Sequence, residues 1–126
     1  MTAKYKRIIF IDDDFFSNLD SCEFLRGCGF NVASAYNTAA VMGLLERHKP
    51  LAALVTDIEL GPGEDGFEVA RRVRELYPDL PVVFISGADS ARARAQGVEG
   101  ACFIAKPYHP RQIAAALDQA INCIAA

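Results

Sequence analysis

The amino-acid sequence predicts an α/β fold, in which a doubly wound parallel sheet of five strands carries helices on both faces. The first observation is a set of short, continuous apolar runs, which are typical of strands covered on both faces. The second is that stretches with apolar residues at helical spacing separate these runs. The third is that the two kinds of segment alternate without a linker or low-complexity tract, which predicts one domain over residues 1–126.

Four of the predicted strands are apolar throughout. They span residues 8–11, 51–55, 82–85 and 101–105. A further predicted strand, residues 30–36, contains the polar residues Asn31 and Ser34. Because a strand at the edge of a sheet is partly solvated, we expect this mixed segment at an edge.

The first two helices are predicted from the residues that begin and end them. The first is expected from about Phe15 to Gly27, because glycine commonly ends a helix. Asn37 is the expected N-cap of the second helix, since its side chain can accept a hydrogen bond from a free backbone N–H. Pro50 lies just beyond the expected end of that helix.

Two later helices are predicted from apolar stripes at a spacing of three or four residues. Asp65 or Gly66 is expected to begin one of them, and Pro78 to end it. The two stripes consist of Val69, Val73 and Leu76, and of Ile113, Leu117, Ala120 and Ile124. Helices with one apolar stripe pack that stripe against a sheet, as the predicted fold requires.

Composition disfavours several classes of protein. The chain has 13 basic and 16 acidic residues and a net charge of −3, which disfavours a nucleic-acid partner. No apolar run has the length of a membrane span, and the polar segment before the first strand lacks the apolar core of a signal peptide. The four cysteines do not have the spacing of a zinc site. We therefore expect a cytoplasmic protein with no membrane partner.

Polar residues whose side chains can bind ligands or take part in catalysis lie where the predicted central strands end. Asp12 and Asp13 follow the first apolar run, and Asp57, Ser86 and Lys106 follow three later ones. In open parallel sheets, ligands bind where the carboxyl ends of the strands meet. The sequence therefore predicts one site that contains three carboxylates, a hydroxyl group and an ammonium group.

The charges of this predicted site favour a metal ion and phosphoryl chemistry. Carboxylates in close proximity repel one another, and a divalent cation relieves that repulsion. Oxygen ligands favour Mg²⁺, Mn²⁺ or Ca²⁺ over zinc. Together with the metal, Ser86 and Lys106 could neutralise the equatorial oxygens of a phosphoryl group. The central Asp57 is then the expected nucleophile, and it would form an acyl phosphate.

An ordered set of motifs resembles the receiver domains of two-component response regulators; the motifs are Ile11-Asp12-Asp13, Asp57, Ser86-Gly87 and Lys106-Pro107. The resemblance covers almost the whole chain and implies a flavodoxin-like receiver fold with strand order 2-1-3-4-5. It implies a phosphoprotein that accepts a phosphoryl group on Asp57 from a histidine kinase or a histidine phosphotransfer protein. It also implies signalling by protein–protein contact, with no enzymatic activity beyond self-phosphorylation and slow autodephosphorylation.

The same resemblance implies a role for each site residue. The implied Mg²⁺ ligands are Asp12, Asp13, Asp57 and the backbone carbonyl of Glu59, with Asp13 as the main acidic ligand. Ser86 and Lys106 would bind the phosphoryl oxygens. Phe103 would be a switch aromatic whose rotamer follows Ser86, although an aromatic residue within an apolar run is also typical of a packed core.

Two segments depart from the family's usual pattern. Residues 57–66 form a loop one residue longer than usual, and its three glycines indicate a remodelled path beside the site. Residues 88–100 show little apolar periodicity, so we expect the family's fourth helix to be short there. Since no output domain is evident after the last predicted helix, we expect a stand-alone regulator; a receiver cut from a hybrid kinase is the alternative.

Two other functions compete with this interpretation. Asp12-Asp13-Asp14 contains the Asp-x-Asp pattern of phosphatases that resemble haloacid dehalogenases, but Asp57 would then have no role. That family also needs further acidic residues after its lysine, where this chain offers only Asp118. The other alternative is a binding module that keeps the receiver fold and works without phosphorylation.

Overall fold

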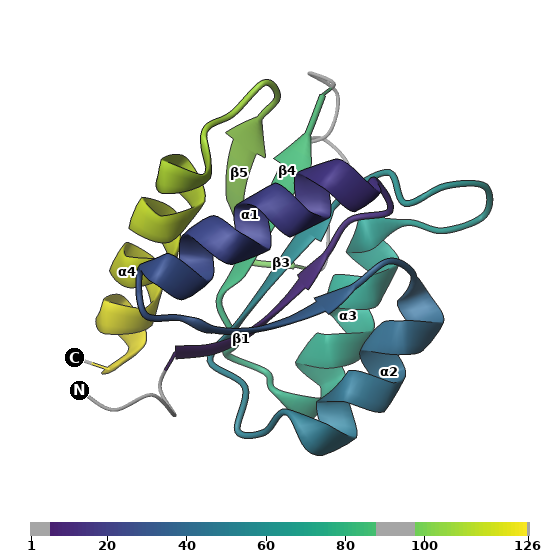
Figure 1. Ribbon diagram of the computed structural model, residues 1–126. Helices are drawn as coiled ribbons and strands as arrows, with labels where there is room; N and C mark the ends of the chain where they lie inside the picture. Colours follow the sequence, from purple (N-terminus) through teal and green to yellow (C-terminus); the bar gives the residue numbers. More distant parts are fainter. Residues whose placement is uncertain (1–5, 88–97, 126) are drawn as a thin grey trace.

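The computed structural model describes residues 6–87 and 98–125 of the chain. Its strands are β1 (Arg7–Ile11), β2 (Asn31–Ala35), β3 (Ala53–Asp57), β4 (Val82–Ser86) and β5 (Cys102–Ala105). Its helices are α1 (Phe15–Gly27), α2 (Thr38–Arg47), α3 (Gly66–Leu76) and α4 (Pro110–Ala125). All neighbouring strands are parallel and lie in the order β2-β1-β3-β4-β5, which confirms the predicted sheet and places β2 at an edge (Figure 1).

Each face of the sheet has its own apolar core. Figure 1 shows α1 and α4 on one side of the sheet and α2 and α3 on the other. On β1, Ile8 and Phe10 belong to the core with α1 and α4, whereas Ile9 and Ile11 belong to the core with α2 and α3. This division follows from the alternation of side chains along a strand. It explains why the central strands are apolar without interruption.

Side chains at the N-termini fix where three of the helices begin. Asp14 accepts hydrogen bonds from the backbone N–H groups of Phe16 and Ser17 and so caps α1. Asn37 caps α2, as the sequence predicts, and Asp65, one of the two residues expected at the start of α3, caps that helix. These caps satisfy N–H groups that have no partner within the helix.

The predicted position of the third strand is wrong by two residues. The apolar run begins at Leu51, but β3 begins at Ala53 and ends at Asp57. Leu51 is a loop residue whose side chain is buried in the core, whereas Thr56 and Asp57 are polar residues buried within the strand. Hydropathy cannot distinguish these two cases. Asp57 is therefore the last residue of its strand, as Ser86 is of β4.

The predicted stripe of α3 is also wrong at its end. Val69 and Val73 are fully buried, but Leu76 is 65% exposed. Leu76 is the last residue of the helix, and the core beside it is filled by Leu80 and the partly buried Tyr77 from the following turn. The predicted weak fourth helix of the family falls mainly on residues 88–97, which lie outside the described residues. None of the helices in the described ranges is long and apolar enough to span a membrane.

Candidate functional site

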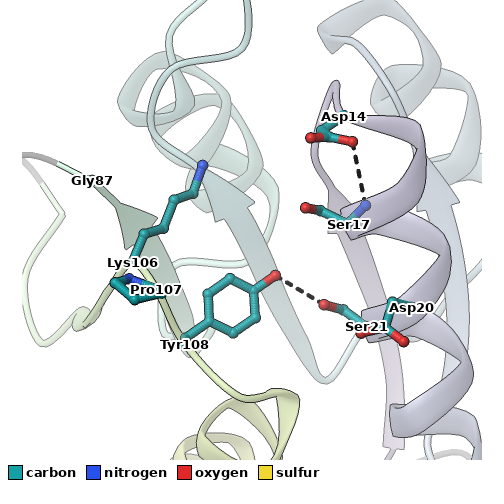
Figure 2. Close-up of a pocket in the computed structure, with 8 residues that line it drawn as sticks. All are labelled: Asp14, Ser17, Asp20, Ser21, Gly87, Lys106, Pro107 and Tyr108. Carbon is teal, nitrogen blue, oxygen red and sulfur yellow. Dashed lines mark hydrogen bonds between the residues drawn. The ribbon is translucent and has the colours of Figure 1, made fainter.

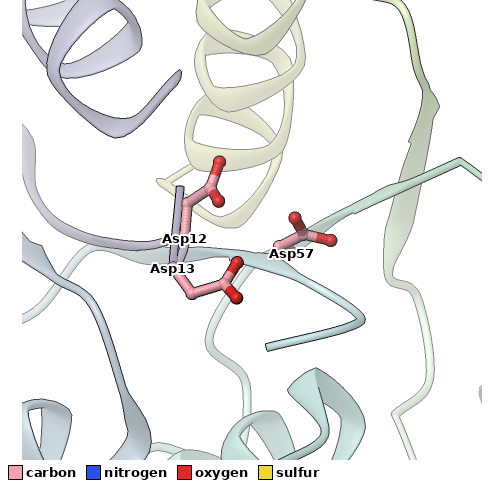
Figure 3. Close-up of side chains that lie close together, drawn as sticks. All are labelled: Asp12, Asp13 and Asp57. Atoms are coloured by element: carbon pink, nitrogen blue, oxygen red, sulfur yellow. The ribbon is translucent and has the colours of Figure 1, made fainter. Parts of the chain in front are cut away.

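Three carboxylates converge at the carboxyl edge of the sheet. Ile11 of β1 pairs with Thr56 of the adjacent β3, so the residues that follow these two lie next to each other. Asp12, Asp13 and Asp57 each offer an oxygen within 4.8 Å of the other two (Figure 3). Asp12 and Asp57 are buried, whereas Asp13 is exposed. The arrangement of these three side chains matches the predicted cluster.

Asp12 has an electrostatic environment that suits a cation. Its Oδ1 accepts a hydrogen bond of 2.9 Å from the backbone N–H of Asp14, while its buried Oδ2 has no hydrogen-bond partner among the described residues. Burial, with the charges of Asp57 and Asp13, raises the pKa of Asp12 to about 6. A buried carboxylate oxygen without a donor is costly unless a cation approaches it. The residues present therefore fit a divalent metal ion bound by oxygen.

Asp57 is held between a backbone donor and a lysine. Its Oδ2 accepts a hydrogen bond of 2.7 Å from Nζ of Lys106, and its Oδ1 accepts one of 3.3 Å from the backbone N–H of Glu59. Burial raises the pKa of Asp57 although the hydrogen bond from Lys106 acts in the opposite direction. Burial acts to lower the pKa of Lys106, but the hydrogen bond and charge of Asp57 raise it, so the ammonium group stays charged. The side chain of Asp57 is 5% exposed and that of Lys106 is 41% exposed, so Lys106 is the member of the pair that faces solvent.

The remaining predicted residues lie around this centre. Ser86 ends β4, and its carbonyl accepts a hydrogen bond of 2.8 Å from the backbone N–H of Lys106. Phe103 lies on β5 and is half-buried, with its ring stacked on Phe84 at a centroid distance of 5.3 Å. Glu59 is exposed at the start of the loop after β3. The packing of Phe103 is compatible with either a core or a switch role.

Asn18 supports the site, although its role is not evident from the sequence analysis. It is fully buried on α1, and its Nδ2 donates to the backbone carbonyls of Asp12 and Ala35, each at 2.9 Å. Asn18 thereby joins the ends of β1 and β2 to α1. The signal that could have revealed it is an amide within the buried stripe that Cys22 and Leu25 continue.

A second supporting contact lies beside a pocket of about 530 Å³ next to Lys106 (Figure 2). The hydroxyl groups of Tyr108 and the buried Ser21 are 2.8 Å apart and share a hydrogen bond. This contact ties the segment after β5 to α1 and so restrains the chain that follows Lys106. A pair separated by 87 positions leaves no local pattern in the sequence.

Gly66 allows α3 to approach the strand that carries Asp57. A Cβ atom at this position would lie 2.3 Å from the backbone oxygen of Asp57 and 3.0 Å from Cα of Ile58. The backbone N–H of Gly66 also donates a hydrogen bond of 2.7 Å to the carbonyl of Ile58. Only glycine permits so close a contact between two backbone segments.

The sequence and the structure of this chain are similar to those of known receiver proteins. The chain is 33% identical over 110 residues to the response regulator receiver protein CpdR of Brucella abortus (strain 2308), which covers 86% of this chain and 90% of CpdR. It is 26% identical over 108 residues to an uncharacterized transcriptional regulatory protein, YbdJ, of Bacillus subtilis (strain 168), and covers 47% of its length.

Comparison of structures gives the same result. The crystal structure of a response regulator receiver protein from Sinorhizobium medicae WSM419 matches with a TM-score of 0.82 and 31% identity, over 91% of this chain and 93% of that one. The family described as response regulator receiver domain matches residues 8–118. The chain therefore belongs to the response regulator receiver domain family.

Proposed function

We propose that residues 1–126 form a single receiver domain that accepts a phosphoryl group on Asp57 and signals through contact with another protein. The observation that carries this proposal is the environment of Asp57, a buried carboxylate that touches Lys106 and lies beside Asp12 and Asp13. The proposed donor is a phosphorylated histidine of a kinase or phosphotransfer protein. The acidic net charge of −3 supports a protein partner over a nucleic acid, and the proposed compartment is the cytoplasm.

The proposed metal ligands are Asp12, Asp13, Asp57 and the carbonyl of Glu59, and the proposed ion is Mg²⁺. When bound, Mg²⁺ supplies positive charge that offsets the negative charge of the carboxylates and of the phosphoryl oxygens. Asp12 gains most from this charge, because its buried Oδ2 has no donor within residues 6–87 and 98–125 and its pKa is raised to about 6.

In the proposed transfer, a carboxylate oxygen of Asp57 attacks phosphorus in line with the leaving group. A P–O bond forms while the P–N bond to the donor imidazole breaks; the imidazole nitrogen keeps the electron pair of that bond and takes up a proton from solvent. Lys106 already lies at the acceptor oxygen, so its ammonium group neutralises charge on the phosphoryl oxygens without a large movement.

The proposed switch begins with the same phosphoryl group. Ser86 ends the strand beside Asp57, and its hydroxyl is the proposed hydrogen-bond donor to a phosphoryl oxygen. A shift of Ser86 would change the space available to Phe103, whose ring packs on Phe84 of the same strand as Ser86. The aromatic side chain would thereby couple the phosphorylation state to the surface at β5. Phosphorylation would shift the equilibrium between two positions of this side chain.

The direct test is intact mass after incubation with Mg²⁺ and acetyl phosphate. We expect one added phosphoryl group on the wild type and none on Asp57→Asn or in the presence of a metal chelator. Asp79→Asn, which changes an exposed carboxylate far from the acceptor in the fold, is the matched control and should be labelled like the wild type.

A phosphorylated histidine protein serves as the second donor, because some acceptors discriminate against small donors. Labelling that persists in Asp57→Asn would refute the assignment of the acceptor. A wild-type chain that neither donor can label would instead favour the binding module that works without phosphorylation.

A further inference from the structure

The loop between β3 and α3 forms a small ordered hairpin beside the carboxylates. Glu59 and Asp65 pair as an antiparallel bridge across its base. The backbone N–H of Glu64 donates a hydrogen bond of 3.1 Å to the carbonyl of Gly61, and the carbonyl of Glu64 accepts one of 3.4 Å from Leu60. Gly61 and Gly63 have φ angles of 109° and 78°, which the tight turn requires. The loop therefore has a defined path.

The path of this loop decides the geometry of the proposed metal site. At its start, the backbone N–H of Glu59 contacts Oδ1 of Asp57 at 3.3 Å. Near its tip, a Cβ atom at Gly61 would lie 3.6 Å from Oδ2 of Asp13. The loop thus contacts Asp57 and passes close to Asp13, so a displaced loop would change the space around both carboxylates.

One side chain of the loop is tied to a different element of the fold. A carboxylate oxygen of Glu64 accepts a hydrogen bond of 2.7 Å from the backbone N–H of Thr38, the first residue of α2. Hydrogen bonds with Thr38 lower the pKa of Glu64, so the carboxylate is ionised at neutral pH. A negative charge at the N-terminus of a helix is favourable, because unpaired N–H groups and the helix dipole point at it.

The N-terminus of α2 therefore has two caps of different origin. Asn37, the adjacent residue, accepts a hydrogen bond of 2.9 Å from the backbone N–H of Ala40. Glu64 caps the same helix from 26 positions away and is part of the hairpin loop. Loss of either cap removes a hydrogen bond from α2, but only loss of the second releases the loop.

We propose that Glu64 is a positioning residue for the metal site. Its contact with α2 holds the β3–α3 loop in place, and the loop in turn holds Glu59 against Asp57 and keeps Gly61 close to Asp13. This inference rests on the proposed function for the identity of the ion. Without the contact, the glycine-rich loop has more conformations to lose when the ion binds, and that loss of entropy weakens binding.

The test compares Mg²⁺ affinity by calorimetric titration in the full chain. Residues that support metal ligands indirectly change metal affinity by about 10–100-fold, and we expect the lower end for Glu64→Ala because the loop is a local hairpin. Glu64→Gln keeps an acceptor oxygen and should restore most of the affinity. Glu64→Asp keeps the charge but is too short to reach Thr38, so it should resemble Glu64→Ala and serves if the alanine variant does not fold.

Asn37→Ala is the matched control, because it removes the other cap of α2. We expect it to lower the stability of the protein and to leave the Mg²⁺ affinity within about twofold of the wild type. The positioning role would be overturned if Glu64→Ala and Glu64→Asp bound Mg²⁺ as tightly as the wild type. It would also be overturned if Asn37→Ala lost as much Mg²⁺ affinity as Glu64→Ala.

A second measurement separates this inference from the proposed function. Amide exchange of Leu60, measured by NMR without metal, should be faster in Glu64→Ala than in Asn37→Ala, because only the first variant frees the loop. If the wild type does not bind Mg²⁺, the proposed function fails, and the exchange rates still decide whether Glu64 fixes the loop. Equal exchange rates of Leu60 in Glu64→Ala and Asn37→Ala would show that the contact between Glu64 and Thr38 does not restrain the loop.

Discussion

Replacement of Gly66 by alanine should destabilise the fold, because this residue touches the backbone of the acceptor strand. The new Cβ would lie 2.3 Å from the backbone oxygen of Asp57, well inside van der Waals contact. The segments cannot easily separate, since the N–H of Gly66 is bound to the carbonyl of Ile58 at 2.7 Å and Phe67 beside it is 2% exposed. Either the hydrogen bond or the packing of α3 must give way.

The expected magnitude follows from two opposing effects. Forcing an additional carbon into a packed region costs about 1–3 kcal/mol, and more where the neighbour is backbone. Alanine is favoured over glycine by up to about 1 kcal/mol within a helix, but less at the first helical residue, which Gly66 is. We therefore expect the free energy of unfolding to fall by at least about 2 kcal/mol. Labelling of Asp57 should also slow, because the displaced carbonyl belongs to the acceptor residue.

Urea unfolding of Gly66→Ala beside Gly43→Ala is the assay. Gly43 lies within α2, and in the described part of the chain a Cβ there would meet only the guanidinium of Arg47, at 3.8 Å. The same substitution at Gly43 should raise the free energy of unfolding by about 0.5–1 kcal/mol. The reasoning is refuted if Gly66→Ala is as stable as the wild type, or if the two variants shift in the same direction.

Two further predictions concern the carboxylate cluster and its support. Since the pKa of Asp12 is raised from 3.8 to about 6, the metal-free folded state holds a proton that the unfolded chain releases, and the free energy of unfolding should fall as pH rises through this window. Urea unfolding at both ends of this pH window should show a smaller fall of the free energy of unfolding with Mg²⁺ or in Asp12→Asn. The same fall in all three cases would contradict the assignment to Asp12. Asn18→Ala should cost about 2 kcal/mol, because the buried carbonyl of Asp12 loses its donor. Thermal unfolding of Asn18→Ala and of Asn122→Ala, an exposed control on α4, tests this prediction. Equal stabilities of the two variants would exclude a supporting role for Asn18.

The course of the sheet could be predicted because its central strands are buried on both faces. Residues 8–11 and 82–85 are apolar without interruption, and both lie in strands whose ends agree with the prediction to one residue. The predicted position of β3 was wrong by two residues because Thr56 and Asp57 are polar and nevertheless buried. The Thr56 hydroxyl donates a hydrogen bond of 2.8 Å to the carbonyl of Asp57. Polarity predicts exposure only where no neighbour satisfies the polar group.

The cluster of carboxylates could be predicted from topology, since the ends of parallel strands meet. The residues that hold the cluster in place could not, because their partners are remote in the sequence. Tyr108 meets Ser21 across 87 positions and Glu64 meets Thr38 across 26. No periodicity or motif encodes such a pair. Each depends on how α1 and α2 pack on the finished sheet.

The parallel strand order also determines where the chain tolerates insertions, because the two edges of the sheet have different roles. The carboxylates, Ser86 and Lys106 of the candidate site lie at the carboxyl edge of the sheet, and the turns that enter the strands, such as residues 78–81, lie at the opposite edge. One residue inserted after β3 would move a ligand by about 3.3 Å, whereas one inserted before β4 lengthens a turn that touches none of the site. Lineages that share this domain should therefore vary more freely in length along the opposite edge, whereas an extra residue at the carboxyl edge, such as the one in residues 57–66, has to be taken up by a turn that leaves the ligands in place.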